Sequence, residues 1–212
     1  MNWLAHILLS ENHIEHQLGN LLTDPLKGKA WEAASERILY GIEMHKRIDA
    51  FTDSHSIVSK SKARLTKRGH LKGVVLDILY DHFLSQHWDS FCTIPREVFL
   101  EDFRFDAMLA IHDYPGKAQR VISRVVATRQ LSSYIHMRGV IDAFERIDTR
   151  LSDRARSKDT TTRYIPFIAE ERDYLEAAFL EFFPELMAMV KETCYRNDVT
   201  HWKVNLHNVG PT

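Results

Sequence analysis

The chain has 212 residues, of which 44% are hydrophobic and 27% charged, an ordinary balance for one globular domain. Its 28 basic and 29 acidic residues leave a net charge of −1, so no global positive field favours a nucleic acid partner. No apolar run approaches the roughly 20 residues of a membrane span, and the opening MNWLAHILLSENH lacks a basic leader with a cleavage site. We therefore expect a cytoplasmic protein with no membrane or nucleic acid partner.

The chain contains only 8 glycines and 6 prolines and shows no sustained alternation of apolar and polar residues, which favours an all-α fold. We predict a single-domain helical bundle over residues 1–196, followed by a loose polar tail over 197–212. The segment 16–28 is predicted to be rich in turns. The expected helices are 2–12, 31 or 36 to 52, 56–67, 70–91, 95–114, 117–131, 133–156 and 165–191, the last perturbed by Pro184.

The segment 73–88, GVVLDILYDHFLSQHW, is apolar nearly all round and is expected to lie in the core. It nevertheless contains Asp77, Asp81 and His82, and its two carboxylates are one helical turn apart and share a face. Buried carboxylates are costly unless they are paired with cations or bound to a metal. This segment therefore requires positive charge from elsewhere in the chain.

The helix that ends GIEMHKRIDAFTDSH offers one solution, because His45, Asp49 and Asp53 follow one another at intervals of four residues. Packed against the segment 73–88, it would gather carboxylates and imidazoles. Such a set suits a hard or borderline divalent ion, manganese first, with magnesium or iron as alternatives. Asp24, in the predicted turn region, can add a ligand. The alternative is a buried ion network in which the carboxylates are neutralised by Arg47, Arg64 or Arg138.

A basic segment lies between these two helices. It has no acidic residue from position 60 to 72, and a charge run of this kind is most often a solvated face. Beside a hydrolytic site, it also suits an anionic substrate or an acidic protein partner. The residues predicted to bind such a partner are Lys60, Lys62, Arg64, Lys67 and Arg68.

Four blocks in order, MNWLAH, GNLLTDPLKG, GIEMHKRIDAFTDSH and LDILYDHFLSQHW, resemble the acyl carrier protein phosphodiesterase family. That family is similar to the HD phosphohydrolases, which are all-helical metal-dependent enzymes, although the dyad here reads Asp81-His82 instead of His-Asp. The resemblance implies hydrolysis of the phosphodiester between 4'-phosphopantetheine and a serine of holo-acyl carrier protein, with manganese or magnesium required. The family's blocks fall on His6, Asp24, His45, Asp49, Asp53, Asp77, Asp81 and His82.

Residues and resemblance together predict a metal-assisted phosphodiesterase acting on acyl carrier protein. Asp77 is expected to orient a ligating histidine, His6 to deliver a proton or contact phosphate, and Arg47 or Arg64 to stabilise the non-bridging oxygens. Two alternatives stay open: an HD-type hydrolase of a nucleotide or other small phosphodiester, and a non-catalytic helical module that binds acidic partners. The predicted metal ligands are Asp24, His45, Asp49, Asp81 and His82.

Overall fold

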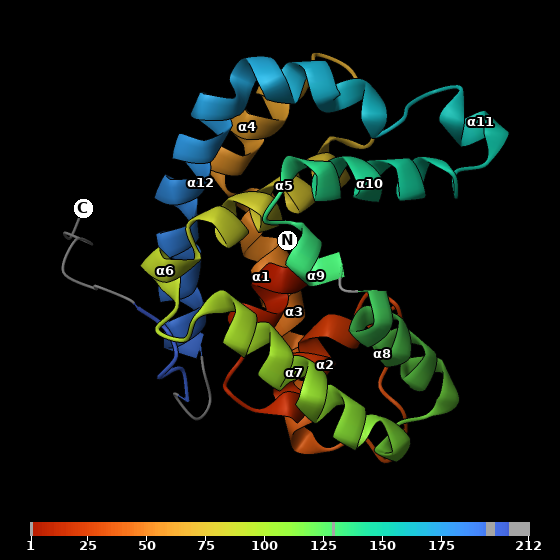
Figure 1. Cartoon of the computed structure of the whole chain (residues 1–212), viewed down its shortest axis with the longest axis vertical. Helices are drawn as coiled ribbons and strands as arrows, with labels where there is room; N and C mark the ends of the chain where they lie inside the picture. Colours follow the sequence, from red (N-terminus) through yellow and green to blue (C-terminus); the bar gives the residue numbers. More distant parts are fainter. Residues whose placement is uncertain (1, 129, 194–197, 204–212) are drawn as a thin grey trace.

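A computed structural model describes residues 2–128, 130–193 and 198–203 of the chain. These residues form an all-α bundle, which confirms the predicted fold class (Figure 1). No described helix is both long enough and apolar enough to pass through a membrane. The elements are α1 (Trp3–Leu8), α2 (Ile14–Leu22), α3 (Glu36–Ser54), α4 (Ser56–Leu65), α5 (Lys72–Gln86), α6 (Trp88–Phe91), α7 (Arg96–Ala110), η1 (Ile111–Asp113), α8 (Gly116–Thr128), α9 (Gln130–Ser133), α10 (Met137–Asp148), α11 (Asp153–Arg156), η2 (Thr162–Tyr164) and α12 (Ile165–Thr193).

The prediction of a turn-rich segment over 16–28 was wrong for its first half, because α2 covers Ile14–Leu22. Gly19 belongs to a close helix crossing and not to a turn. A Cβ atom at Gly19 would lie 2.4 Å from the Ile38 carbonyl oxygen of α3, and one at Gly41 would lie 2.3 Å from the His16 carbonyl oxygen. Only glycine permits this approach, so α2 and α3 cross with their backbones nearly in contact. The crossing places Asn20 of α2 against His45 of α3.

The prediction that the segment 73–88 is a core helix was correct as far as Gln86, where α5 ends. Trp88 begins the separate short helix α6. Helix α5 buries apolar residues on all sides, among them Val75, Leu79 and Phe83.

The long helix α12 lies beside α4 and α5 along one side of the bundle and is continuous through Pro184 (Figure 1). Its phenylalanines pack against aromatic residues of α5 and α6, with the Phe179 ring tilted to Tyr80 and the Phe183 ring edge-on to Phe91. The short helix α1 packs against α5 of this group and against α2.

The predicted loose tail begins too early. Residues 198–203 pack onto the bundle, where His201 and Trp202 are 2% and 7% exposed. The backbones of Cys92 and Trp202 form an antiparallel bridge, and the Trp202 indole donates to the Leu8 carbonyl oxygen at 2.7 Å. Burial of a histidine and a tryptophan stabilises this segment against the bundle. The remainder of the predicted tail, 204–212, lies outside the described residues.

Candidate metal centre

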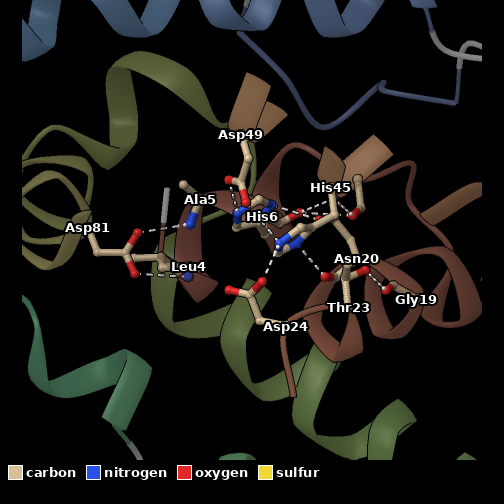
Figure 2. Close-up of polar contacts among 11 residues, drawn as sticks. Leu4, Ala5, His6, Gly19, Asn20, Thr23, Asp24, His45, Asp49 and Asp81 are labelled. Carbon is tan, nitrogen blue, oxygen red and sulfur yellow. Dashed lines mark hydrogen bonds and ion pairs between the residues drawn. The ribbon is translucent and has the colours of Figure 1, made fainter. Parts of the chain in front are cut away.

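Helix α1 is held from both ends by other parts of the chain. It has six residues, too few to be stable alone, and the Asn2 side chain does not cap it. The carboxylate of Asp81 in α5 accepts from the Leu4 and Ala5 amides at 3.0 and 3.1 Å instead (Figure 2). At the other end, Trp202 donates to the Leu8 carbonyl. These contacts fix the position of His6, which is fully buried in the middle of the helix.

Asn20 of α2 orients both histidines of the site. Its side-chain amide donates to the His6 carbonyl and to Ser10 Oγ, each at 3.0 Å, so its Oδ1 is left to accept from His6 Nδ1 at 2.7 Å. Its backbone carbonyl lies 2.8 Å from His45 Nδ1. Because both acceptors are oxygens that carry no proton, each histidine holds its proton on Nδ1 and presents a lone pair on Nε2.

The two Nε2 atoms meet the carboxylates of Asp49 and Asp24 (Figure 2). His6 Nε2 lies 3.3 Å from Asp49 Oδ1, and His45 Nε2 lies 3.1 Å from Asp49 Oδ2. Asp24, at the end of α2, brings its Oδ1 to 3.2 Å from His45 Nε2. The two imidazole rings stack with their centroids 4.0 Å apart. The histidines are buried, whereas the side chains of Asp49 and Asp24 are 36% and 72% exposed, so the cluster opens to solvent on its carboxylate side.

This arrangement brings lone pairs face to face and therefore requires a cation between them. Although burial lowers the pKa of His45, its hydrogen bonds with Asp24 and Asp49 raise it to about 9, so that in the absence of metal a proton fills this place. Burial lowers the pKa of His6 to about 4, which keeps that imidazole neutral. Burial raises the pKa of Asp49, but hydrogen bonds with His45 and His6 outweigh it and hold that pKa below the usual range.

The donor set fits a divalent metal ion. Ligand atoms of His6, His45 and Asp49 all lie within 4.8 Å of one another. Atoms that share one ion at about 2.1 Å are about 3.0–3.5 Å apart, which matches the separations of 3.1–3.3 Å seen here. Imidazole nitrogen with carboxylate oxygen suits manganese, magnesium or iron, and the Nδ1 bonds to Asn20 are the supporting contacts that a ligating histidine normally has.

The structure separates the second predicted pair of ligands from this cluster. Asp81 is fully buried and its carboxylate oxygens accept the α1 amides, while His82 Nδ1 lies 2.7 Å from the Tyr134 carbonyl oxygen. The prediction that Asp81 and His82 bind the same ion as His45 is therefore corrected. The Asp81 carboxylate and His82 Nδ1 are thus partnered by backbone groups. The two amides offset only part of the cost of burying Asp81, because burial still raises the pKa of its carboxyl to about 7.

Asp77 and Asp53 also lie elsewhere than expected. Asp77 lines a pocket that Asp24 also lines, and burial raises its pKa. The Nδ1 atoms of His45 and His82 bond to backbone carbonyls, so the orienting role predicted for Asp77 belongs to Asn20 at His45. Asp53 lies one turn beyond Asp49 on α3, with its side chain 76% exposed and paired with Lys62 at 2.9 Å.

The arginines proposed as catalytic or neutralising groups are engaged away from the cluster. Arg47 lies on the exposed face of α3 and pairs with Glu43 at 3.4 Å, so its predicted role at the phosphate is corrected. Its position follows from helix geometry, because residues two apart point to nearly opposite sides. Arg64 pairs with Glu171 at 3.4 Å and Arg138 with Asp142 at 2.8 Å. The alternative of a buried arginine network around Asp77 and Asp81 is therefore wrong.

The predicted basic segment is an exposed surface formed by α4 and the loop that follows it. Two of its members are already paired, Lys62 with Asp53 and Arg64 with Glu171, and the Arg64 guanidinium also lies 4.6 Å from the centre of the Tyr174 ring. The other three are exposed and make no ion pair with any residue that the structure describes: Lys60, Lys67 and Arg68.

Two features escaped the sequence reasoning. His6 was predicted to act on a proton or on phosphate, but the structure places it among the candidate ligands. Asn20 was not predicted at all, because Gly19-Asn20 was interpreted as a turn. A helical interpretation of ENHIEHQLGNLL would have placed Asn20 on a buried face with Leu21 and His16, where a polar side chain needs partners.

A family model and individual relatives of known name point to the same protein family. The family model described as acyl carrier protein phosphodiesterase matches residues 1–186. The chain is 30% identical over 193 residues to an acyl carrier protein phosphodiesterase of Yersinia pestis, covering 88% of this chain and 96% of that protein. Proteins of the same name from Enterobacter sp. (strain 638) and Escherichia coli O139:H28 are 28% and 27% identical, covering 90% and 89% of this chain and 98% and 96% of their own lengths. No solved structure gives a significant match, so the likeness to HD phosphohydrolases stays a prediction.

Proposed function

The chain belongs to the acyl carrier protein phosphodiesterase family, and from this membership and the geometry of the site we propose that it releases 4'-phosphopantetheine from holo-acyl carrier protein by metal-dependent hydrolysis. The observation that carries the metal dependence is the set of lone pairs that converge from His6, His45 and Asp49. A structural role would not need an open cluster of this kind, because a buried structural carboxylate faces donors, as Asp81 faces two backbone amides.

Each residue of the cluster has a distinct part in the proposed reaction. His6, His45 and Asp49 would hold the ion, with Asp24 as a further oxygen, and manganese, magnesium or iron fits this set. When bound, such an ion lowers the pKa of a water and stabilises charge on phosphoryl oxygens. Asn20 keeps both Nε2 lone pairs directed into the site.

The reaction needs a proton acceptor at the open edge of the cluster, and Asp24 is suited to this role. Its side chain is 72% exposed and lies at the open edge of the cluster, where its carboxylate can accept a proton from a water instead of binding the ion. The water oxygen forms a bond to phosphorus while the bond from phosphorus to the serine oxygen breaks. The proton taken from the water then passes to the serine oxygen, giving apo-acyl carrier protein and 4'-phosphopantetheine.

The direct test is to incubate purified protein with holo-acyl carrier protein and weigh the carrier by mass spectrometry. We expect a loss of mass equal to the phosphopantetheine group in the presence of manganese, magnesium or iron, and no loss after chelation by EDTA. Free coenzyme A and nucleotides serve as comparison substrates. Turnover of these small molecules with an intact holo-carrier would favour a small-phosphodiester hydrolase and contradict the proposal. An intact holo-carrier with every metal tested would contradict it as well.

The basic segment is the proposed docking surface for the acidic carrier protein. Support comes from Lys60, Lys67 and Arg68, whose exposed charges are not neutralised by described residues. Because the contact is a surface charge pair, Lys67→Glu should raise KM for the carrier by about 3- to 10-fold and leave kcat unchanged. Lys46→Glu, an equal charge reversal on the exposed face of α3, is the control. Equal KM values for the two variants would remove the docking assignment.

A further inference from the structure

A pocket of about 340 Å³ adjoins the metal centre. It shares Asp24 with the cluster, since Asp24 lines the pocket and lies 3.2 Å from His45 Nε2. Trp3, which also lines it, is the first residue of the helix that carries His6. A ligand that occupies this pocket would therefore lie beside the carboxylate edge of the centre, where the cluster is open to solvent.

Two arginines from separate helical elements line the same pocket. Arg124 belongs to α8, and Arg150 follows the end of α10. Figure 1 shows α8 and α10 on the same side of the bundle, with the short helix α9 between them. Neither guanidinium group makes an ion pair or hydrogen bond with a residue that the structure describes, unlike Arg138 of α10, which pairs with Asp142 at 2.8 Å. Their donors are therefore available to a ligand.

The rest of the lining is mixed: the side chains of Asn2, Asp77 and Gln130 are polar, and the others are apolar or aromatic. Trp3, Ile78 and Ile147 contribute apolar surface, and the Tyr134 hydroxyl is already bonded to the side chains of Asn2 and Gln130. A pocket that combines guanidinium groups with apolar walls matches an elongated ligand that has a phosphate at one end and an uncharged arm. Guanidinium groups bind phosphate well because their planar donors fit two oxygens at once.

We propose that Arg124 and Arg150 bind the phosphate of 4'-phosphopantetheine in this pocket while the apolar walls receive its pantetheine arm. The assignment rests on the proposed function for the identity of the ligand, and it adds two substrate-binding residues outside the sequence blocks at residues 1–90. Arg124 and Arg150 also account for substrate discrimination: a phosphate without the arm would gain only the charge contacts, and an arm without phosphate only the apolar ones.

Calorimetric titration of the full chain with 4'-phosphopantetheine, pantetheine and inorganic phosphate tests the assignment. Arg124→Gln and Arg150→Gln should each raise the Kd for 4'-phosphopantetheine about 10-fold or more, because each removes charged hydrogen bonds, and should leave the Kd for pantetheine within about twofold. Inorganic phosphate should compete with 4'-phosphopantetheine only weakly. Arg→Lys at either position keeps the charge but not the planar donors, so its effect should be intermediate.

Matched controls lie on the same helices. Arg120→Gln is one turn before Arg124 on α8, and Arg138→Gln lies on α10, and neither residue lines the pocket. Both should bind 4'-phosphopantetheine as the unaltered chain does. The assignment is overturned if both pocket variants bind it normally, or if they lose pantetheine to the same degree. The urea midpoint of each variant shows whether it is destabilised. Where an Arg→Gln variant is destabilised, the Kd of the Arg→Lys variant at the same position tests the assignment in its place.

The outcome separates this assignment from the proposed function. Turnover of holo-carrier by the unaltered chain, together with normal binding by both pocket variants, would remove the assignment and leave the function standing. If the chain leaves every holo-carrier intact but binds 4'-phosphopantetheine in a way that depends on Arg124 and Arg150, the proposed function is removed and the binding assignment stands.

Discussion

The two histidine–aspartate pairs of the core, His45 with Asp49 on α3 and Asp81 with His82 on α5, look alike in sequence and behave differently in the fold. Three of these four side chains are almost completely buried, and Asp49 is partly exposed. The α5 pair is satisfied by backbone groups of opposite polarity, the Leu4 and Ala5 amides and the Tyr134 carbonyl. On α3, the Nε2 atom of His45 and the carboxylate of Asp49 present lone pairs to each other, and the Nε2 atom of His6 presents a further lone pair to Asp49.

This difference shows that burial of charge does not by itself mark a metal site. A carboxylate that accepts two backbone amides needs no cation, and here it serves as the cap of a short helix. A carboxylate beside an imidazole lone pair needs either a proton or a metal. Asp81 still supports the centre, but as a positioning residue, because it holds α1 and hence His6 in place.

The largest effect that tests this difference between the two pairs is expected from neutralising Asp49. Asp49→Asn removes the charge that both imidazoles face, so we expect more than about 100-fold loss of turnover and loss of bound metal, beyond the effect typical of groups that only support ligands. Metal content and hydrolysis of holo-carrier are the measurements. Asp53→Asn, one turn further along α3 on an exposed side chain, is the matched control and should retain both. Full activity in Asp49→Asn would contradict the conclusion that the α3 pair, unlike the α5 pair, binds the metal.

The complementary change at Asp81 should affect stability first. In Asp81→Asn the side-chain NH2 group would face a backbone amide, so one buried N–H would lose its acceptor, and we expect the free energy of unfolding to fall by about 2–3 kcal/mol. Urea unfolding measures this loss. The folded fraction should still bind metal, because the ligands on α3 are untouched. If Asp81→Asn loses its metal while its stability is unchanged, Asp81 is a metal ligand and not a positioning residue.

The stability of the metal-free protein should also depend on pH. The pKa of His45 is raised from 6.5 to about 9, so its contribution to stability is fully present below pH 6.5 and is lost as pH rises through 9. We expect the unfolding free energy in EDTA to fall by about 3 kcal/mol over this range. His45→Gln should abolish the dependence, and saturating manganese should suppress it by replacing the proton. A slope that persists in His45→Gln would assign the titration to another group.

Much of the site was predictable from spacing, and the errors have physical reasons. His45 and Asp49 are a turn apart on one helix, a local relation that sequence determines. The grouping of Asp81 and His82 with them depended on how α5 packs, and adjacent residues on a helix point in different directions. Asp81 therefore points to α1 and His82 to Tyr134. Asn20 was missed because Gly19 was interpreted as a turn residue, whereas it permits a helix crossing.

By itself, the sequence determined the all-α class, the buried helix α5, the pairing of His45 with Asp49 on one face of α3 and the basic segment, because each follows from local periodicity or composition. Only the tertiary structure decided which buried charges meet one another. It placed His6 opposite Asp49 and gave Asp81 to the amides of α1. It also brought Arg124 and Arg150 to the pocket beside Asp24. These contacts join residues far apart in the chain, and their formation depends on the packing of helices whose crossing no local pattern encodes.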